Sequence, residues 1–308
     1  MQAWLEVVAK GTVLVFVVAC MAAAGLGLGV RDLVAPLSRA RLVVLALVAN
    51  FVVAPAVAYG LTRLIALEQP YAIGLLLLGG AAGAPFLPKL AQLARGDMAF
   101  SVGLMLLLTV GSVVFMPVVL PLLVPGLSPD PWAILRPLLF TMLIPITAGM
   151  IIKARSERWA TRLRMVFVPF ANLSMVVAVA LLIGLNFDAM IGTLGSGALA
   201  TGILFVTFSL IVGYAAGGPE RRTRSVLGLG TGQRNVAAAL LIATQSFSDP
   251  KVAVMLLMTT LAGLVVLVVA ARWFAKGGPG GGRRVADVIH AEAAVPNETR
   301  VRDALSLS

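Results

Sequence analysis

The sequence predicts an all-α protein that crosses a membrane many times, and three observations lead to this fold class. Of its 308 residues, 60% are hydrophobic and only 12% are charged. A soluble domain usually carries about 25% charged residues, so the composition excludes an ordinary water-soluble protein. The apolar residues also form continuous runs that do not alternate with polar residues, which favours transmembrane helices over a closed β-barrel.

Nine apolar segments have the length of spans, since a transmembrane helix needs about 20 residues. They cover residues 6–28, 39–64, 70–94, 98–124, 132–153, 165–185, 193–215, 224–247 and 251–275. The first is expected to be a retained span, because it runs long and has no basic region before it as a signal peptide would. We therefore expect residues 1–276 to form one transmembrane domain, followed by a flexible tail over residues 277–308 that begins with a glycine run.

The loop charges predict the orientation through the positive-inside rule. The loops after the odd-numbered spans, together with the region around and after the end of the ninth, hold 18 of the 24 Lys and Arg residues. The opposite loops hold only Arg63, Arg136 and Lys251. This pattern predicts an inner (plasma) membrane protein with its N-terminus outside and its C-terminal tail in the cytoplasm. It also explains the net charge of +11 without nucleic-acid binding.

No cofactor and no metal ion are expected. The single Cys20 lies in an apolar run and the single His290 lies in the tail, so neither has metal-ligand partners nearby. The alternating glycines 228, 230 and 232 do not indicate a dinucleotide loop, because no strand precedes them.

Two apolar segments are interrupted. The third contains Gly83, Pro85, Pro88 and Lys89, and prolines and glycines in mid-span predict a broken helix. The eighth repeats the pattern with glycines followed by polar side chains at membrane depth: Gly230, Thr231, Gly232, Gln233, Arg234 and Asn235. Small residues also permit close helix packing, which is the plainer interpretation.

Two broken spans favour a transporter with inverted repeats, in which discontinuous helices meet near the membrane midplane and form the binding site. If spans five to nine are the second repeat, the eighth span is its fourth member. The third span is then the fourth member of a first repeat that lacks its opening helix.

At these segments the chain resembles the bile acid:sodium symporter family. The similarity is clearest in residues 49–55 (ANFVVAP), 93–102 (LARGDMAFSV) and 230–235 (GTGQRN). The resemblance implies a core domain with two broken, crossing helices, a panel domain that moves against it, and organic anions as substrates.

The family's sodium ligands are largely replaced. The resemblance aligns Leu87 and Pro88 with a Ser-Asn pair, Gly230 with a Glu and Arg234 with a Gln. A ligand Thr becomes Met105, while Ser101 and Asn235 survive and Asn50 replaces a Gln. Sodium needs several hard oxygen ligands, so sodium is not expected as a partner.

We hypothesise that Arg234 and Lys89 act as tethered cations in place of the ions and that an anionic substrate completes the charge pair. In the alternative, Arg234 caps carbonyls freed by its broken helix and Lys89 extends to the membrane surface. Asn50, Ser101, Gln233, Thr231 and Asn235 either contact the substrate or stabilise the crossing backbone.

These features predict a secondary transporter of small organic anions that works by alternating access without sodium. The alternatives are a sodium-coupled anion symporter with an altered ion site and a membrane sensor that does not transport. An enzyme is not expected, since the spans contain neither paired Asp residues nor metal-ligand spacing. Bile acids, keto acids, hydroxy acids and sulfonated anions all suit a cationic pocket.

Overall fold

The computed structural model describes residues 2–29, 39–124, 126–127, 130–185, 187, 191 and 195–277. Its first half contains α1 (Gln2–Gly27), α3 (Ala40–Val48), the π-helix η2 (Ala49–Val53), α4 (Ala54–Leu64), α5 (Gln69–Gly80), α6 (Leu87–Leu93) and α7 (Met98–Leu123). Its second half contains α8 (Pro131–Leu138), the π-helix η3 (Leu139–Leu143), α9 (Ile144–Arg155), α10 (Glu157–Leu185), α12 (Ala198–Ala216), α13 (Arg221–Gly232), α14 (Val236–Ser246) and α15 (Pro250–Lys276). The expected all-α class is confirmed, and the predicted tail lies outside the described residues from position 278 onward.

Within the described residues, eight helices or helix pairs are long and apolar enough to cross a membrane. The remaining predicted span, residues 70–94, consists of the shorter helices α5 and α6 with a break between them. The start of the sixth span was predicted wrongly: α10 starts at Glu157, eight residues before the predicted start at residue 165. The charged residues in the first turns of α10 resemble a loop in sequence.

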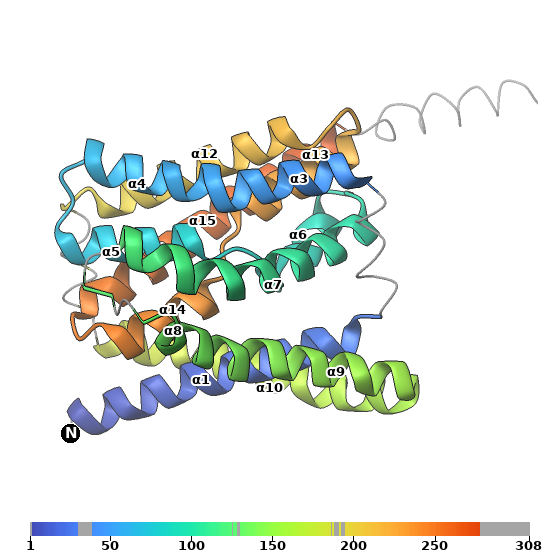
Figure 1. Cartoon of the computed structure of the whole chain (residues 1–308), viewed down its shortest axis with the longest axis horizontal. Helices are drawn as coiled ribbons and strands as arrows, with labels where there is room; N and C mark the ends of the chain where they lie inside the picture. Colours follow the sequence, from blue (N-terminus) through green and yellow to red (C-terminus); the bar gives the residue numbers. More distant parts are fainter. Residues whose placement is uncertain are drawn as a thin grey trace, which may run out of the picture.

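The helices form two groups (Figure 1). The panel group consists of α1, the α8–α9 span and α10, which pack on one another, and the core group consists of α3 to α7 and α12 to α15. Contacts between the groups include α1 against α14, α8 against α7 and α14, and α10 against α15. The panel is packed closely because Gly25 and Gly149 lack side chains: a Cβ on Gly25 would lie 2.1 Å from the Ile146 carbonyl oxygen.

The surface suits a lipid bilayer. The outer face of α10 exposes Met165, Val166, Leu173 and other apolar side chains that would be costly in water. All four tryptophans are exposed and lie near helix ends: Trp4, Trp132, Trp159 and Trp273. Tryptophan is enriched at membrane–water interfaces, so these positions fit helices that span the bilayer. The chain is a multi-pass membrane protein.

Candidate functional site

The first broken helix is held by the neighbouring helix α7. Helix α5 ends at Gly80 and α6 begins at Leu87, which leaves the backbone between them without helical hydrogen bonds. The Ser112 hydroxyl accepts from the Ala82 N–H at 2.8 Å and donates to the Ala82 carbonyl at 2.9 Å. These bonds replace partners that water would supply outside a membrane.

Gly83 has the backbone conformation that this break requires. Its φ is +81°, in the region that favours glycine, and a Cβ would lie 2.2 Å from the Thr109 backbone nitrogen. Its carbonyl accepts hydrogen bonds from the Thr109 hydroxyl at 2.7 Å and from the Asn235 amide at 3.2 Å. Gly83 and Pro85 therefore lie within the break.

The second broken helix touches the first directly. Helix α13 ends at Gly232 and α14 begins at Val236. The Asn235 N–H donates to the Ala81 carbonyl at 2.8 Å, and the Asn235 side chain caps α14 by accepting from the Ala238 N–H at 3.2 Å. The two non-helical segments, residues 81–86 and 233–235, are called the crossovers below.

Three predictions of helix-breaking residues need correction. Gly230 lies inside α13, where its missing side chain makes room for Leu87 and Leu104: a Cβ would lie 3.0 Å from a Leu87 methyl carbon. Gly232 is the last residue of α13 and not part of the break. Pro88 lies in the first turn of α6, a position where its missing N–H costs nothing.

Arg234 is bound on all sides by oxygen atoms of the core group. The residue is 5% exposed. Its Nε donates to the Leu78 carbonyl at 3.1 Å, and Nη2 donates to the Gly79 carbonyl. Its Nη1 donates to Asn50 Oδ1 at 3.0 Å and to the Thr231 carbonyl at 3.4 Å, and Nη2 also reaches the Asn50 carbonyl at 3.4 Å. A guanidinium has five N–H donors, so all of them are used.

Asn50 connects a third helix to this cluster. It lies in the π-helix η2, just before Pro55 in the first turn of α4. The wider turn of a π-helix changes the direction in which the Asn50 side chain points. The Asn50 amide donates to the Thr231 hydroxyl at 3.1 Å and to the Ala46 carbonyl at 3.0 Å. Asn50, Thr231 and Arg234 thus form one hydrogen-bonded group, and the neighbouring Asn235 bonds separately to the first crossover.

A cavity of about 410 Å³ lies between the panel and core groups. Both crossovers contribute to its wall, through Ala84 to Phe86 and Gln233 to Asn235. Helices α1, α10 and α15 supply most of the remaining lining residues. None of the lining residues is an Asp or a Glu, whereas three are cationic: Lys89, Arg164 and Arg234.

The other predicted site residues are distributed differently. Lys89 lines the cavity, with its Nζ 5.4 Å from the centre of the Phe86 ring. Gln233 also lines it, and its Oε1 is buried without a hydrogen-bond partner in the described structure. Ser101 is buried in α7 and donates to the Met98 carbonyl of its own helix at 2.8 Å, so its hydroxyl does not join the described hydrogen bonds of the crossovers.

Arg164 was not predicted as a cavity residue, because its charged neighbours indicate a loop. It lies in the second turn of α10, and its guanidinium rests against the backbone of α1: a Cβ on Gly27 would lie 3.2 Å from Arg164 Cζ. The run of charged residues before position 165 resembles an inside loop, and only the extended length of α10 reveals that this one faces the cavity.

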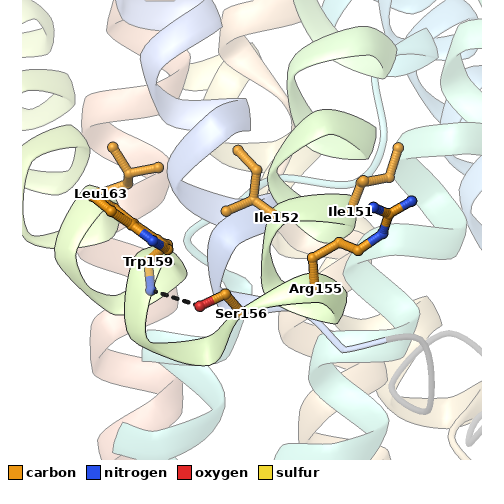
Figure 2. A pocket seen from close by; sticks show the side chains of 6 residues that line it. All are labelled: Ile151, Ile152, Arg155, Ser156, Trp159 and Leu163. Carbon is orange, nitrogen blue, oxygen red and sulfur yellow. Dashed lines mark hydrogen bonds between the residues drawn. The ribbon is translucent and has the colours of Figure 1, made fainter.

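The described residues contain no group of His, Cys, Asp and Glu side chains suited to a metal ion. A second hollow, of about 450 Å³, lies at the turn between α9 and α10 (Figure 2). It is lined by Ile151, Ile152, Arg155, Ser156, Trp159 and Leu163, and the Ser156 hydroxyl accepts from the Trp159 N–H at 3.4 Å. It contains no crossover residue, so the cavity at the crossovers is the one between panel and core.

Two broken helices that cross inside a bundle, with a cavity at the crossing, are the arrangement expected from the sequence motifs. A sequence model of the sodium bile acid symporter family matches residues 13–193. The chain belongs to this family. The family consists of membrane transporters and not of enzymes, so the chain is grouped with transport proteins.

Several known relatives extend the similarity over most of the chain. The probable sodium/metabolite cotransporter BASS3, chloroplastic, of Arabidopsis thaliana is 22% identical over 87% of this chain and 62% of its own length. The probable cotransporter BASS1 of the same plant is 26% identical over 75% of this chain and 58% of its own length. The uncharacterized sodium-dependent transporter YocS of Bacillus subtilis is 32% identical over 36% of this chain and 35% of its own. The chain therefore spans about three fifths of the length of the two plant relatives.

Proposed function

We propose that this chain is a secondary transporter of small organic anions that works by alternating access and needs no sodium. Family membership and the relatives named as sodium/metabolite cotransporters support secondary transport. The division into a panel group and a core group, with a cavity between them, supports alternating access. Three cationic and no acidic lining residues support an anionic substrate.

Sodium independence rests on one observation, the hydrogen bonding of Arg234. Its guanidinium is surrounded by five oxygen atoms, of which four are backbone carbonyls and one is the Asn50 side-chain oxygen. Hard oxygen atoms are also the ligands that a sodium ion requires. Arg234 stands where the resemblance aligns an ion-ligand Gln. A guanidinium there supplies a permanent positive charge, so no ion from solution is needed to neutralise these oxygens.

The second expected ion position is apolar. Gly230, which aligns with the family's ion-binding Glu, faces the buried side chains of Leu87 and Leu104. A sodium ion placed among these methyl groups would lose its water without gaining oxygen ligands, which is strongly unfavourable. Both replacements disfavour sodium binding: Arg234 fills one expected ion position with a fixed cation, and Leu87 and Leu104 fill the other with hydrocarbon.

We also propose that the protein lies in an inner (plasma) membrane with its N-terminus outside and its C-terminus in the cytoplasm. The distribution of Lys and Arg among the loops supports this orientation. Arg95, Arg155, Arg221 and Lys276 all lie at the end of the bundle that this orientation makes cytoplasmic. Two reporter enzymes can be fused to the C-terminus, one that is active only in the cytoplasm and one that is active only in the periplasm. We expect the cytoplasmic reporter to be active, and activity of the periplasmic reporter would overturn the orientation.

The experiment is uptake of radiolabelled small carboxylates into proteoliposomes that contain the purified protein. We expect saturable uptake at equal rates when sodium is replaced by potassium or choline. Arg234→Gln should lower uptake at least about tenfold, because the crossovers lose their fixed charge and several hydrogen bonds. Arg162→Gln is the matched control, since Arg162 lies over the Trp159 ring on the surface and does not line the cavity.

Other outcomes of the uptake experiment would indicate a different function. An absolute sodium requirement would contradict the fixed-cation role of Arg234. Flux that rises linearly with concentration would indicate a channel, and binding without flux would indicate a sensor.

A further inference from the structure

We propose that the substrate is an organic dianion with two separated anionic groups, which Lys89 and Arg164 bind from opposite walls of the cavity. This inference rests on the transport function proposed above and specifies its substrate class. Lys89 belongs to α6 in the core group, and Arg164 belongs to α10 in the panel group. Both line the same cavity.

Arg234 is not available to bind the substrate. All five of its N–H donors are engaged by oxygen atoms of the core group. The recognition of an anion therefore depends on the two other cationic side chains of the cavity wall.

Lys89 and Arg164 have no anionic partner among the described residues. The described ion pairs are Arg39 with Asp97, Arg39 with Glu220, and Lys251 with Glu68, and none of these residues lines the cavity. The ammonium group of Lys89 lies over the face of the Phe86 ring, which carries no net charge. Both side chains line the cavity and are exposed, so a ligand of opposite charge can reach them.

Among the described hydrogen bonds, none joins Arg164 to α1, the helix against which it lies. The last carbonyl of that helix, Gly27 O, already accepts a hydrogen bond from Lys153 Nζ at 2.6 Å. Gly27 has no side chain, and a Cβ there would press on the Arg164 guanidinium at 3.2 Å. The glycine thus leaves space for Arg164 beside the cavity.

Two cations on opposite walls favour two anionic groups at opposite ends of the ligand. A monoanion would compensate only one of the two charges. Much of the remaining lining is apolar and suits a hydrocarbon middle, as shown by Phe16, Ala24, Leu78, Val168, Met175 and Leu264. A volume of about 410 Å³ lies at the small end of the range for ligand pockets, about 300–1,000 Å³, which limits the ligand to a small molecule.

The same arrangement couples binding to movement. In the empty carrier, Lys89 and Arg164 carry charges of the same sign on the core and panel sides of the cavity. A bound dianion attracts both and draws the two groups together. The substrate thereby interacts more strongly with the closed state, which is the condition for a ligand to shift a conformational equilibrium.

Cys20 provides a direct measurement of the charge in the cavity. It is the only cysteine of the chain and lines the cavity from α1. In proteoliposomes, we would compare its modification by two methanethiosulfonate reagents, one carrying a sulfonate and one carrying a trimethylammonium group. We expect the sulfonate reagent to react faster, and the ratio of the two rates to fall about tenfold in Lys89→Gln and in Arg164→Gln. Lys89→Arg should preserve the ratio, and Arg162→Gln should not change it.

Competition experiments identify the ligand class. We expect adipate and glutarate to protect Cys20 and to inhibit uptake at least about tenfold better than hexanoate and valerate, and Lys89→Gln to abolish this preference. A rate ratio unchanged in both variants, or equal competition by monocarboxylates, would overturn the inference. Stronger competition by glycerol phosphate, whose charges lie on one group, would overturn the bridging arrangement.

The two proposals fail in different ways. Saturable, sodium-independent uptake of monocarboxylates without preference for dicarboxylates would refute the dianion and leave the proposed function intact. Dicarboxylate uptake that requires sodium would refute the sodium independence of the proposed function and leave the dianion intact.

Discussion

Replacing Arg234 by Gln tests whether this guanidinium holds the crossovers together. The wild-type side chain donates five hydrogen bonds to oxygen atoms. A Gln amide has two N–H donors, so at least three of these bonds are lost. Bonds from charged donors contribute about 1.5–3 kcal/mol each, or about 5–9 kcal/mol for three. Removing a buried cation also removes a desolvation cost of several kcal/mol, which leaves a net loss of about 2–4 kcal/mol.

The assay is thermal unfolding of the purified protein in detergent, where a loss of this size should lower the midpoint by roughly 5–10 °C. The vacated oxygen atoms should then accept sodium. With a dissociation constant of about 10 mM, about 150 mM sodium would restore about 1.6 kcal/mol through linkage. We expect sodium, compared with potassium, to stabilise Arg234→Gln and to leave the wild type and Arg162→Gln unchanged. Sodium-specific stabilisation of the wild type, or no loss in Arg234→Gln, would refute the reasoning.

Two further substitutions test how the first crossover is held. Gly83→Ala should abolish folded protein, because the residue has a φ of +81° and its Cβ would lie 2.2 Å from the Thr109 backbone nitrogen, whereas Gly60→Ala, with nothing within 4 Å, should be tolerated. The yield of monodisperse protein measures both, and equal yields would contradict the close approach. Ser112→Ala should cost about 1–3 kcal/mol because it leaves the Ala82 N–H and carbonyl unpaired. The thermal assay measures this change, and an unshifted midpoint would show that the segment needs no support from α7.

The breaks were predictable because their causes are local. Pro85 and Gly83 interrupt an apolar run, and the structure has a non-helical segment there. The polar residues that end α13 likewise indicated the second break. The second break was predicted to begin at Gly230, which resembles a helix breaker in sequence, but α13 continues to Gly232. In the structure, helix–helix packing against Leu87 and Leu104 decides the role of Gly230.

Other features depend on contacts between distant parts of the chain. Arg234 was considered both as a substrate ligand and as a cap for freed carbonyls, and only its contacts with Asn50, Leu78 and Gly79 show how completely its donors are used. Arg164 could not be assigned to the cavity while its helix was expected to begin at residue 165. The packing of Thr109 and Ser112 against the first crossover was equally hidden, since such hydroxyls in a span more often serve helix packing.

The most direct test of the fixed-cation account is to measure sodium movement during transport. Proteoliposomes would be given a labelled anionic substrate together with radioactive sodium, and the initial uptake of both would be compared in wild-type and protein-free vesicles. We predict that substrate enters while sodium uptake stays at the protein-free level. Entry of one or more sodium ions with each substrate molecule would contradict the claim that Arg234 takes the place of the ion.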